Sequence, residues 1–383
     1  MQEKLSKLST PAYVIDEKRL CENLRILHEV EAESGAKVLL AQKAYSVYQT
    51  YPLVAEYISG ATASGLYEAK LAYEELPGVR TGDKENHVFE PAFKDDEMAE
   101  VCRIADHVVF NSLSQLEHHR SIWEKSGVSV GLRVNPELST QDGHEIYDPC
   151  ASGSRLGIRA CDMPEKLPSG VEGLHFHTLC EQLYEPLEAT FKAFEQKFGK
   201  YLHDIKWLNM GGGHHITKEG YDRKALIELV KKIREKYDIE VYLEPGEAIA
   251  LDAGYLVTTV MDIVETEKYP VLILDTSAAC HMPDVLEMPY RPPLRDSGEA
   301  GEKAFTYRLS SRTCLAGDVI GDYSFDHEIS IGDRLVFEDM AIYSMVKNNT
   351  FNGMALPDIA LLHENGDTEV IKHFGYEDFK MRL

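Results

Sequence analysis

A repeated alternation of strand and helix patterns between residues 38 and 244 is the feature that most limits how this chain folds. Short apolar segments predict strands near 38–42, 61–64, 87–90, 107–110, 129–134, 173–177, 206–210 and 240–244. Helical spacing of apolar residues lies between most of them, most clearly at 66–76, 94–105, 113–126, 186–201 and 222–237. Strands that alternate with helices form right-handed βαβ units and a parallel sheet. Eight units over about 230 residues predict an α/β fold of the (β/α)8 TIM-type barrel kind, with an open doubly wound sheet as the alternative.

The pattern changes near residue 250. Short β-type runs lie at 257–260, 271–274, 334–337 and 359–362, and 296–302 is predicted to be a turn or flexible loop. At the other end, Pro11–Ile15 predicts a strand, and Asp16 is expected to cap a helix whose apolar residues share one face. We predict a barrel over 17–250 and a β-rich domain, a β-barrel or sandwich, over 251–383. The N-terminal strand within 1–16 is expected to complete the second domain.

Composition narrows the class of protein. The chain of 383 residues has no apolar run of about 18 residues, so no membrane span is expected. Its first ten residues lack a signal-peptide core, and its seven cysteines include no Cys-x-x-Cys pair. This pattern disfavours a disulfide framework or a structural zinc site, and we expect a cytoplasmic location. A net charge of −24 disfavours nucleic acid as a partner and attracts cations.

Residues suited to catalysis or binding lie in or just after several predicted strands, at the end of a barrel where active sites form. They are Lys43, Ser64, His175 and His177, the triple glycine Gly211–Gly213, and Glu244. Alternation along 173–177 places both histidines on one face of the strand. Each residue alone also has an ordinary interpretation: a solvent-exposed lysine, a hydrogen-bonded interior histidine, a paired buried acid, or a plain glycine turn.

Taken together, these residues match what pyridoxal 5'-phosphate requires. The cofactor needs a Schiff-base lysine, an aromatic face, an acid for its pyridine nitrogen and an anion site. Glycines let backbone N–H groups approach a phosphate closely, although the sequence contains no G-x-x-x-x-G-K-[ST] motif. We therefore expect this cofactor at the barrel mouth, and no metal ligand among the residues of the site.

Several longer motifs resemble one group of enzymes. They are Thr10–Val14, Ser154–Ile158, His175–Glu181, Glu244–Ala248, Asp275–Asp284 and Cys314–Asp318. Over nearly the whole chain they resemble the decarboxylases of the alanine racemase-like fold, the group that includes ornithine and diaminopimelate decarboxylases. Within that group, the carboxynorspermidine (carboxyspermidine) decarboxylases are most similar. The resemblance implies decarboxylation of carboxynorspermidine, carboxyspermidine or both, to norspermidine or spermidine, in polyamine biosynthesis.

The resemblance also implies roles for single residues. Lys43 would hold the cofactor, His177 would stack on its ring, and Glu244 would bind the pyridine nitrogen. The phosphate would lie against Gly211, Gly212, Gly213, Gly246 and Tyr343, with Ser64 as a further cofactor contact. Cys314 would return a proton to the carbanion in the active site of a partner subunit, so a homodimer with active sites at the interface is expected.

Position 247 departs from the group. Ornithine and diaminopimelate decarboxylases carry an arginine after Glu-Pro-Gly, where it contacts the phosphate, and this chain has Glu247. A carboxylate repels a phosphate but suits a cationic amine. Asp275 and Asp318 are expected to bind substrate nitrogens in the same way, with a strand-end cap as the alternative for Asp275. The substitution favours a polyamine substrate.

Three alternatives remain open. The first is an ornithine- or diaminopimelate-type decarboxylase. The second is an amino acid racemase on the same scaffold, for which Tyr307, Tyr323 and Tyr343 are candidate second bases. The third is a non-catalytic cofactor carrier or regulator, although such a protein is expected to lack the long β-rich part, Lys43 or Cys314. Carboxynorspermidine and carboxyspermidine differ by one methylene, and no motif reports that difference.

Overall fold

The computed structural model describes Leu5, residues 7–141 and residues 145–383, and it divides into two compact units. One unit is Asn23–Ile249, and the other combines Met1–Glu22 with Ala250–Leu383. The sequence-based domain limits, 17–250 and 251–383, remain a prediction. Residues 1–4 and 6 of the predicted N-terminal segment lie outside the described residues.

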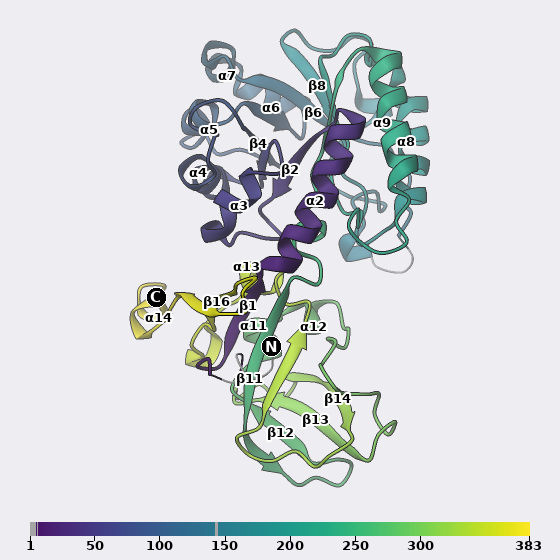
Figure 1. Ribbon diagram of the computed structural model, residues 1–383. Coiled ribbons are helices and arrows are strands. Elements are labelled where there is room, and N and C mark those ends of the chain that lie inside the picture. Colours follow the sequence, from purple (N-terminus) through teal and green to yellow (C-terminus); the bar gives the residue numbers. More distant parts are fainter. Residues whose placement is uncertain (1–4, 6, 142–144) are drawn as a thin grey trace. The chain divides into compact units, whose positions relative to one another are not determined.

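In the described part of Asn23–Ile249, eight parallel strands close into a barrel (Figure 1). They are β2 (Lys37–Ala41), β3 (Gly60–Ala63), β4 (Glu85–Glu90), β5 (His107–Phe110), β6 (Ser129–Asn135), β8 (Val171–His175), β9 (Trp207–Asn209) and β10 (Glu240–Leu243). The strands pair in the order β5-β4-β3-β2-β10-β9-β8-β6, and the pairing of β5 with β6 closes the ring. A short strand β7 (Ile158–Arg159) pairs with the end of β6. The predicted (β/α)8 barrel is confirmed, and the open doubly wound alternative is wrong.

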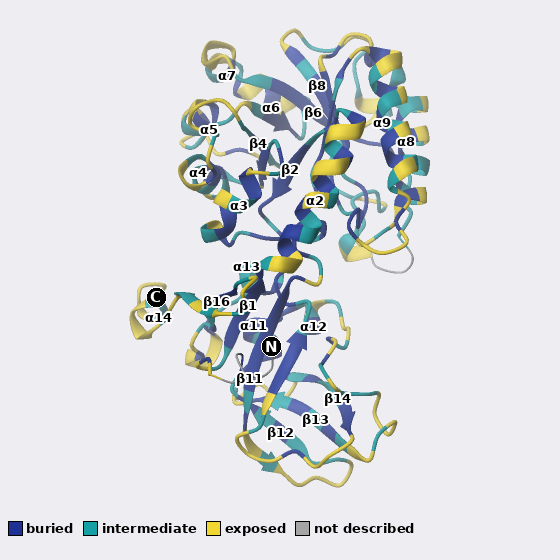
Figure 2. Cartoon of the chain, in the orientation of Figure 1, coloured by how far each residue is buried: buried dark blue, intermediate teal, exposed yellow. Residues whose placement is uncertain are grey.

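Helices lie on the outside of this barrel (Figure 1). They are α2 (Glu17–Ser34), α3 (Tyr51–Ala55), α4 (Leu66–Glu75), α5 (Met98–Ile104), α6 (Leu113–His118), α7 (Arg120–Ser126), α8 (Tyr184–Phe198), α9 (Arg223–Tyr237) and α10 (Glu247–Ala250). Single 3-10 turns occupy η1 (Tyr48–Thr50), η2 (Glu145–Tyr147), η3 (Ala160–Asp162) and η4 (Gly199–Tyr201). The strands are mostly buried, whereas α8 and α9 each present one exposed side (Figure 2).

Local sequence explains where several helices begin and end. The N–H of Arg19 donates to Asp16 Oδ1 at 3.2 Å, so Asp16 caps the first turn of α2. The helix predicted over 113–126 is two helices, because His119 leaves the helical conformation at φ −95° and ψ 6°. The helix predicted over 94–105 begins at Met98, after a turn at residues 95–97. No described helix has the length and apolar character needed to cross a membrane.

The second unit contains a mixed sheet in which the N-terminal strand is central. Its strands are β1 (Ala12–Asp16), β11 (Gly254–Val264), β12 (Val271–Leu274), β13 (Phe305–Ser311), β14 (Val319–Phe325), β15 (Arg334–Glu338), β16 (Asp358–Leu362) and β17 (Thr368–Lys372). They pair in the order β14-β13-β12-β11-β1-β16-β17, and β15 also pairs with β11. Short helices are α11 (Ala278–His281), α12 (Asp284–Glu287), α13 (Ser344–Lys347), η5 (Phe351–Gly353) and α14 (Tyr376–Lys380).

Three strands of this sheet, β13, β14 and β17, have no counterpart in the sequence-based prediction. The predicted runs are rich in β-branched and apolar residues, whereas β13 buries only every second side chain: Tyr307, Leu309 and Ser311. A strand with one buried face alternates apolar and polar residues, so a search for continuous apolar runs misses it. Tyr13 of β1 joins the core that lies against β13, and its hydroxyl donates to the carbonyl of His281.

The amino ends of the barrel strands depend on two glycines that make room for Trp207. A Cβ atom at Gly173 would lie 2.1 Å from the Trp207 ring, and one at Gly131 would lie 2.2 Å from it. Gly173→Ala is therefore expected to destabilise the protein by about 1–3 kcal/mol through overpacking. The measurement is the midpoint of urea unfolding.

Gly375→Ala is the matched control, because a Cβ atom there meets nothing within 4 Å. Its unfolding midpoint is expected to equal that of the wild type. Equal midpoints for all three proteins would contradict the packing described around Trp207.

Candidate active site

A pocket at the carboxyl ends of the barrel strands brings together five of the residues singled out from the sequence: Lys43, Ser64, His175, His177 and Glu244. Lys43 follows β2, Ser64 follows β3, His175 ends β8, His177 follows it and Glu244 follows β10. The remaining lining residues are Ala41, Thr62, Ala63, Phe89 and Arg133. Parallel strands in a closed ring end on the same side, which explains how residues so far apart in sequence share one pocket.

Lys43 and His177 are adjacent in this pocket. Lys43 Nζ lies 3.4 Å from His177 Nε2, and the N–H of Gly212 donates to His177 Nδ1 at 3.0 Å. Burial, reinforced by the neighbouring charge of Lys43, lowers the pKa of His177 well below its ordinary value, so the ring is neutral. Because Nδ1 accepts a hydrogen bond, the ring proton lies on Nε2 and faces the lysine.

The lysine itself is suited to act as a nucleophile. Burial lowers the pKa of Lys43, and the guanidinium of Arg133 lowers it further. A larger fraction of its amine is therefore neutral near pH 7 than for a lysine in water. A neutral amine has the lone pair that bond formation with an aldehyde requires.

Glu244 is the ionised acid of the pocket. Burial by itself raises the pKa of its carboxyl, but His175 and Asn209 counter this effect and hold the pKa at about 2. His175 Nε2 lies 3.5 Å from Glu244 Oε2, and Asn209 Nδ2 donates to Glu244 Oε1 at 2.8 Å. Burial also lowers the pKa of His175, so the negative charge of this pair resides on Glu244.

Arg133 and Asn209, which hydrogen-bond to groups of the site, were not singled out from the sequence. Arg133 is buried on β6, its guanidinium lies 4.6 Å from the centre of the Phe89 ring, and it donates to the carbonyl of His177 at 2.9 Å. Asn209 is fully buried and accepts from the N–H of Gly211 at 2.8 Å. Both are polar residues inside strands that are mostly buried. Because a buried polar residue needs hydrogen-bond partners, this pattern in the sequence could have marked them as candidate site residues.

The triple glycine follows β9 and runs close to the neighbouring backbone. A Cβ atom at Gly212 would lie 1.9 Å from the carbonyl oxygen of Glu244, and Gly211 has a positive φ of 67°. Gly246 is similarly close, with 2.8 Å between its Cβ position and Cβ of Ala44. Glycine is therefore required sterically at these positions, whatever their part in phosphate binding, which remains a prediction.

Glu247 already has a partner within the chain. Its Oε2 forms a hydrogen bond with His215 Nε2, and the two side chains are 13% and 6% exposed. His215 follows the triple glycine by two positions, so this bond links the loop after β9 to the start of α10. The predicted contact of Glu247 with a substrate amine remains a prediction.

Cys314 and Asp318 belong to one turn of the second unit. Cys314 is exposed, and its N–H donates to Asn352 Oδ1 at 3.3 Å. Asp318 is buried, and its Oδ2 accepts at 2.6 Å from each of Ser277, Ser311 and Thr313, while its Oδ1 accepts from the N–H groups of Ala278 at 2.9 Å and Ala279 at 3.2 Å. With five donors in place, this carboxylate fixes the turn that carries Cys314.

Asp275 and Tyr343 are also in the second unit. Asp275 Oδ1 accepts from the Thr258 hydroxyl at 2.6 Å and from the N–H of Thr259 at 2.9 Å, which is the bonding expected of a strand-end cap. It also lines a surface cavity with Arg312. Tyr343 has a positive φ of 52° and precedes α13. Substrate and cofactor roles for these two residues remain predictions.

Comparison with known proteins identifies one family. Residues 12–341 match the family model described as "Pyridoxal-dependent decarboxylase, C-terminal sheet domain". The carboxynorspermidine/carboxyspermidine decarboxylase of Campylobacter jejuni is 46% identical, and the alignment covers 98% of this chain and 99% of that protein. The carboxyaminopropylagmatine decarboxylase of Synechocystis is 41% identical, with 99% of this chain and 97% of that protein covered.

Solved structures of similar proteins agree with this family match. The crystal structure of carboxynorspermidine decarboxylase from C. jejuni complexed with norspermidine has a TM-score of 0.91 at 44% identity, covering 98% of this chain and 100% of that chain. Diaminopimelate decarboxylase from Helicobacter pylori, complexed with L-lysine, has a TM-score of 0.82 at 17% identity, covering 100% of this chain and 98% of that chain. This second likeness shows the shared fold.

The hydrogen bonds of Asp318 give a direct test of the turn that carries Cys314. Asp318→Asn replaces one acceptor oxygen with a donor NH₂ group and leaves buried hydroxyls or N–H groups unpaired. We expect a loss of about 2 kcal/mol or more in the free energy of unfolding, measured with urea.

Asp326→Asn is the control, since the Asp326 side chain is 75% exposed and pairs only with Lys303 at 2.8 Å in the described structure. Its free energy of unfolding is expected to stay within about 0.5 kcal/mol of the wild type. An equally small change in Asp318→Asn would show that this network does not stabilise the fold.

Proposed function

We propose that this chain, which belongs to the pyridoxal-dependent decarboxylase family, removes carbon dioxide from carboxynorspermidine or carboxyspermidine in polyamine biosynthesis. It is a decarboxylase, a lyase, and its cofactor is pyridoxal 5'-phosphate. The observation that carries the proposal is the pocket in which Lys43, His177 and Glu244 lie together. This set fits the cofactor, since it offers an amine of lowered pKa, a neutral ring and an ionised acid.

Each of these residues has a distinct task in the proposal. The bound cofactor supplies an electron sink for the pair left when the carboxylate departs. Lys43 would bond to the cofactor and be displaced by the substrate amine. His177 would cover one face of the ring, held in place by the N–H of Gly212. Glu244 would keep a proton on the ring nitrogen, a task for which an ionised carboxylate with a pKa of about 2 is suited.

The substrate is proposed to be a long amine with a terminal amino acid group. The two relatives with 46% and 41% identity both act, by name, on carboxylated polyamine-type molecules. A chain with a net charge of −24 also attracts a polycation over distance. Carboxyaminopropylagmatine is the second candidate substrate, because the Synechocystis relative carries that name. Both candidates use the same reacting group and differ at the far end of the molecule.

A homodimer with shared active sites completes the proposal. Cys314 is exposed on a turn that Asp318 fixes. A residue that donates a proton to a substrate bound by the partner subunit has to be exposed and held in place in this way. A thiol is a group that can donate a proton to a carbanion. The cytoplasmic location is proposed on the cysteine content alone.

The first test is an absorbance spectrum of the purified protein with pyridoxal 5'-phosphate, followed by carbon dioxide release. We expect a visible band in the wild type and no such band in Lys43→Ala. The control is Lys70→Ala, which should keep the band, because Lys70 is a partly exposed lysine paired with Glu100 at 2.9 Å. Release is expected from carboxynorspermidine, carboxyspermidine or carboxyaminopropylagmatine, and at least about tenfold more slowly from ornithine and meso-diaminopimelate.

The same test separates the alternatives. Rapid release from diaminopimelate or ornithine would replace the polyamine assignment. A band without release, accompanied by exchange of the substrate Cα proton with deuterated water, would favour a racemase. A band with neither activity would favour a carrier or regulator.

Cys314→Ala tests the proton donor. We expect turnover to fall by roughly 10²–10⁴-fold while the visible band is unchanged, as loss of a general acid does. Cys161→Ala is the control, because Cys161 is also an exposed free cysteine. Full activity in Cys314→Ala would remove this residue from the mechanism.

Mixing Lys43→Ala with Cys314→Ala under subunit-exchange conditions tests the shared site. A heterodimer would contain one site with both residues intact, so activity is expected to recover to roughly a quarter of wild type. No recovery, in spite of measured exchange, would mean that each site uses its own Cys314.

A further inference from the structure

Outside the pocket, two groups of side chains in the described structure combine two histidines with one carboxylate. One group is Glu85, His87 and His107, and the other is Asp95, His118 and His119. In each group one nitrogen or oxygen atom per residue lies within 4.8 Å of the others. Imidazole nitrogens with a carboxylate oxygen are common ligands of zinc and related ions. The two groups differ in whether their geometry suits an ion.

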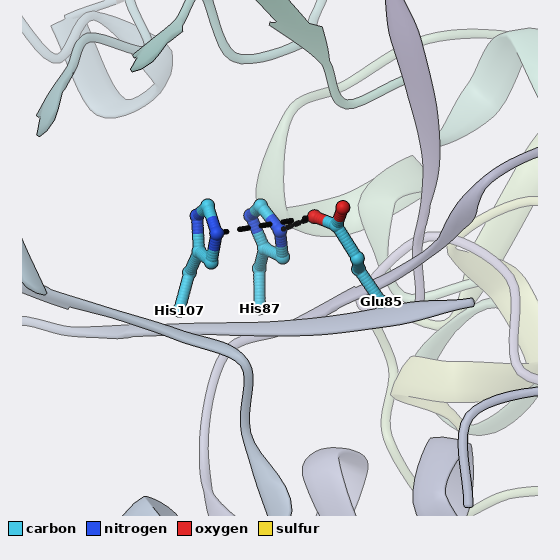
Figure 3. Close-up of side chains that lie close together, drawn as sticks. All are labelled: Glu85, His87 and His107. Atoms are coloured by element: carbon cyan, nitrogen blue, oxygen red, sulfur yellow. Dashed lines mark hydrogen bonds and ion pairs between the residues drawn. The ribbon is translucent and has the colours of Figure 1, made fainter. Parts of the chain in front are cut away.

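The first group does not suit an ion. The His87 and His107 rings are stacked, with 4.0 Å between their centres and 21° between their planes (Figure 3). A ring nitrogen binds a metal in the plane of its ring, and nearly parallel planes do not converge on one point. Glu85 also bonds to Lys37 through Oε1 and to His87 through Oε2 at 2.8 Å. The nearby ammonium repels a cation.

The second group has a histidine already oriented as a metal ligand. His119 is buried, and its Nε2 lies 3.3 Å from the carbonyl oxygen of Phe93. A carbonyl only accepts, so Nε2 donates to it, and Nδ1 is the ring nitrogen that remains for a metal ion. A metal-bound histidine usually donates its other ring N–H to a carbonyl or carboxylate in this manner. Nδ1 of His119 lies 4.0 Å from Asp95 Oδ1, so two acceptors face each other.

His118 supplies the third atom. Its Nε2 lies 2.6 Å from the same Oδ1 of Asp95, and its ring is inclined at 79° to that of His119. Zinc bonds of 2.0–2.2 Å separate tetrahedral ligand atoms by about 3.4 Å, so the two distances from Asp95 Oδ1 to the histidine nitrogens must each change by less than about 1 Å. The Asp95 side chain is 78% exposed and lies on a turn, and His118 is 56% exposed. Both are free of the packing that would prevent such a shift.

We propose that Asp95, His118 and His119 bind a divalent transition-metal ion of the zinc or nickel class, with the remaining coordination position open to water. The ion cross-links the segment between β4 and α5 to the junction of α6 and α7 in the barrel unit. The site is separate from the catalytic pocket and has no part in decarboxylation. The acidic surface of the chain favours the approach of a cation.

The test uses the cofactor-loaded full chain after treatment with a chelator, titrated with nickel(II) chloride in a calorimeter at pH 7.5. Wild type is expected to bind one ion per chain at this site. Asp95→Asn and His118→Ala are each expected to bind it at least tenfold more weakly, because each removes one of three ligands. Because both side chains are exposed, neither substitution is expected to disturb folding. An unchanged rate of decarboxylation in both variants checks that they are folded.

His373→Ala is the matched control. His373 is 74% exposed and pairs with Asp358 at 2.7 Å, so it is also an exposed histidine beside an aspartate. It belongs to none of the metal-ligand groups found among the described residues. This variant is expected to bind nickel(II) as the wild type does. Nickel(II) should also raise the thermal unfolding midpoint of the wild type and the control, and not that of the two site variants.

The proposal is overturned if the wild type binds no nickel(II), or if Asp95→Asn and His118→Ala bind it as tightly as the wild type. Loss of binding in His373→Ala alone would place the ion at the other pair and overturn it as well.

Discussion

The closed ring of parallel strands is the constraint on which the candidate active site depends. Pairing of β5 with β6 closes the barrel, and pairing of β10 with β2 sets Tyr242 opposite Lys37 and Leu243 opposite Val38. Lys43 and Glu244 follow these two strands, so a register fixed by backbone hydrogen bonds brings the lysine and the acid to one pocket although about two hundred residues separate them. A (β/α)8 barrel places its chemistry at these strand ends because no core packing is disturbed there.

Inside the pocket, burial sets the protonation states and a few hydrogen bonds adjust them. Burial lowers the pKa of Lys43 and of His177, which makes both groups neutral more readily. The same burial would neutralise Glu244, but Asn209 and His175 stabilise its negative charge. One desolvated pocket therefore holds an ionised acid beside two groups that burial drives toward their neutral forms. Asn209 connects Glu244 to the triple glycine, since it donates to Glu244 and accepts from the N–H of Gly211.

Aspartate residues show how strongly local partners decide what a side chain does. Asp318 is buried and its two oxygens accept five hydrogen bonds, so it shapes a turn. Asp275 accepts from two threonines at the end of a strand. Asp95 is exposed and faces two histidines, one of which is fixed by the carbonyl of Phe93. The same residue type is thus structural in two places and is a candidate ligand in the third.

The sequence alone determined the barrel and the residues at its strand ends, because apolar periodicity and the ends of buried runs are local properties of the chain. It also identified the family, since whole motifs such as His175–Glu181 and Cys314–Asp318 are linear. The tertiary structure decided the partners: Arg133 against Phe89, Asn209 with Glu244, His215 with Glu247, and His119 with Phe93. The tertiary structure also decided that β13, β14 and β17 form strands, because one face of each is buried only by its neighbouring strands. Such pairings depend on which segments of the chain approach one another in the folded protein. A local sequence pattern does not contain that information.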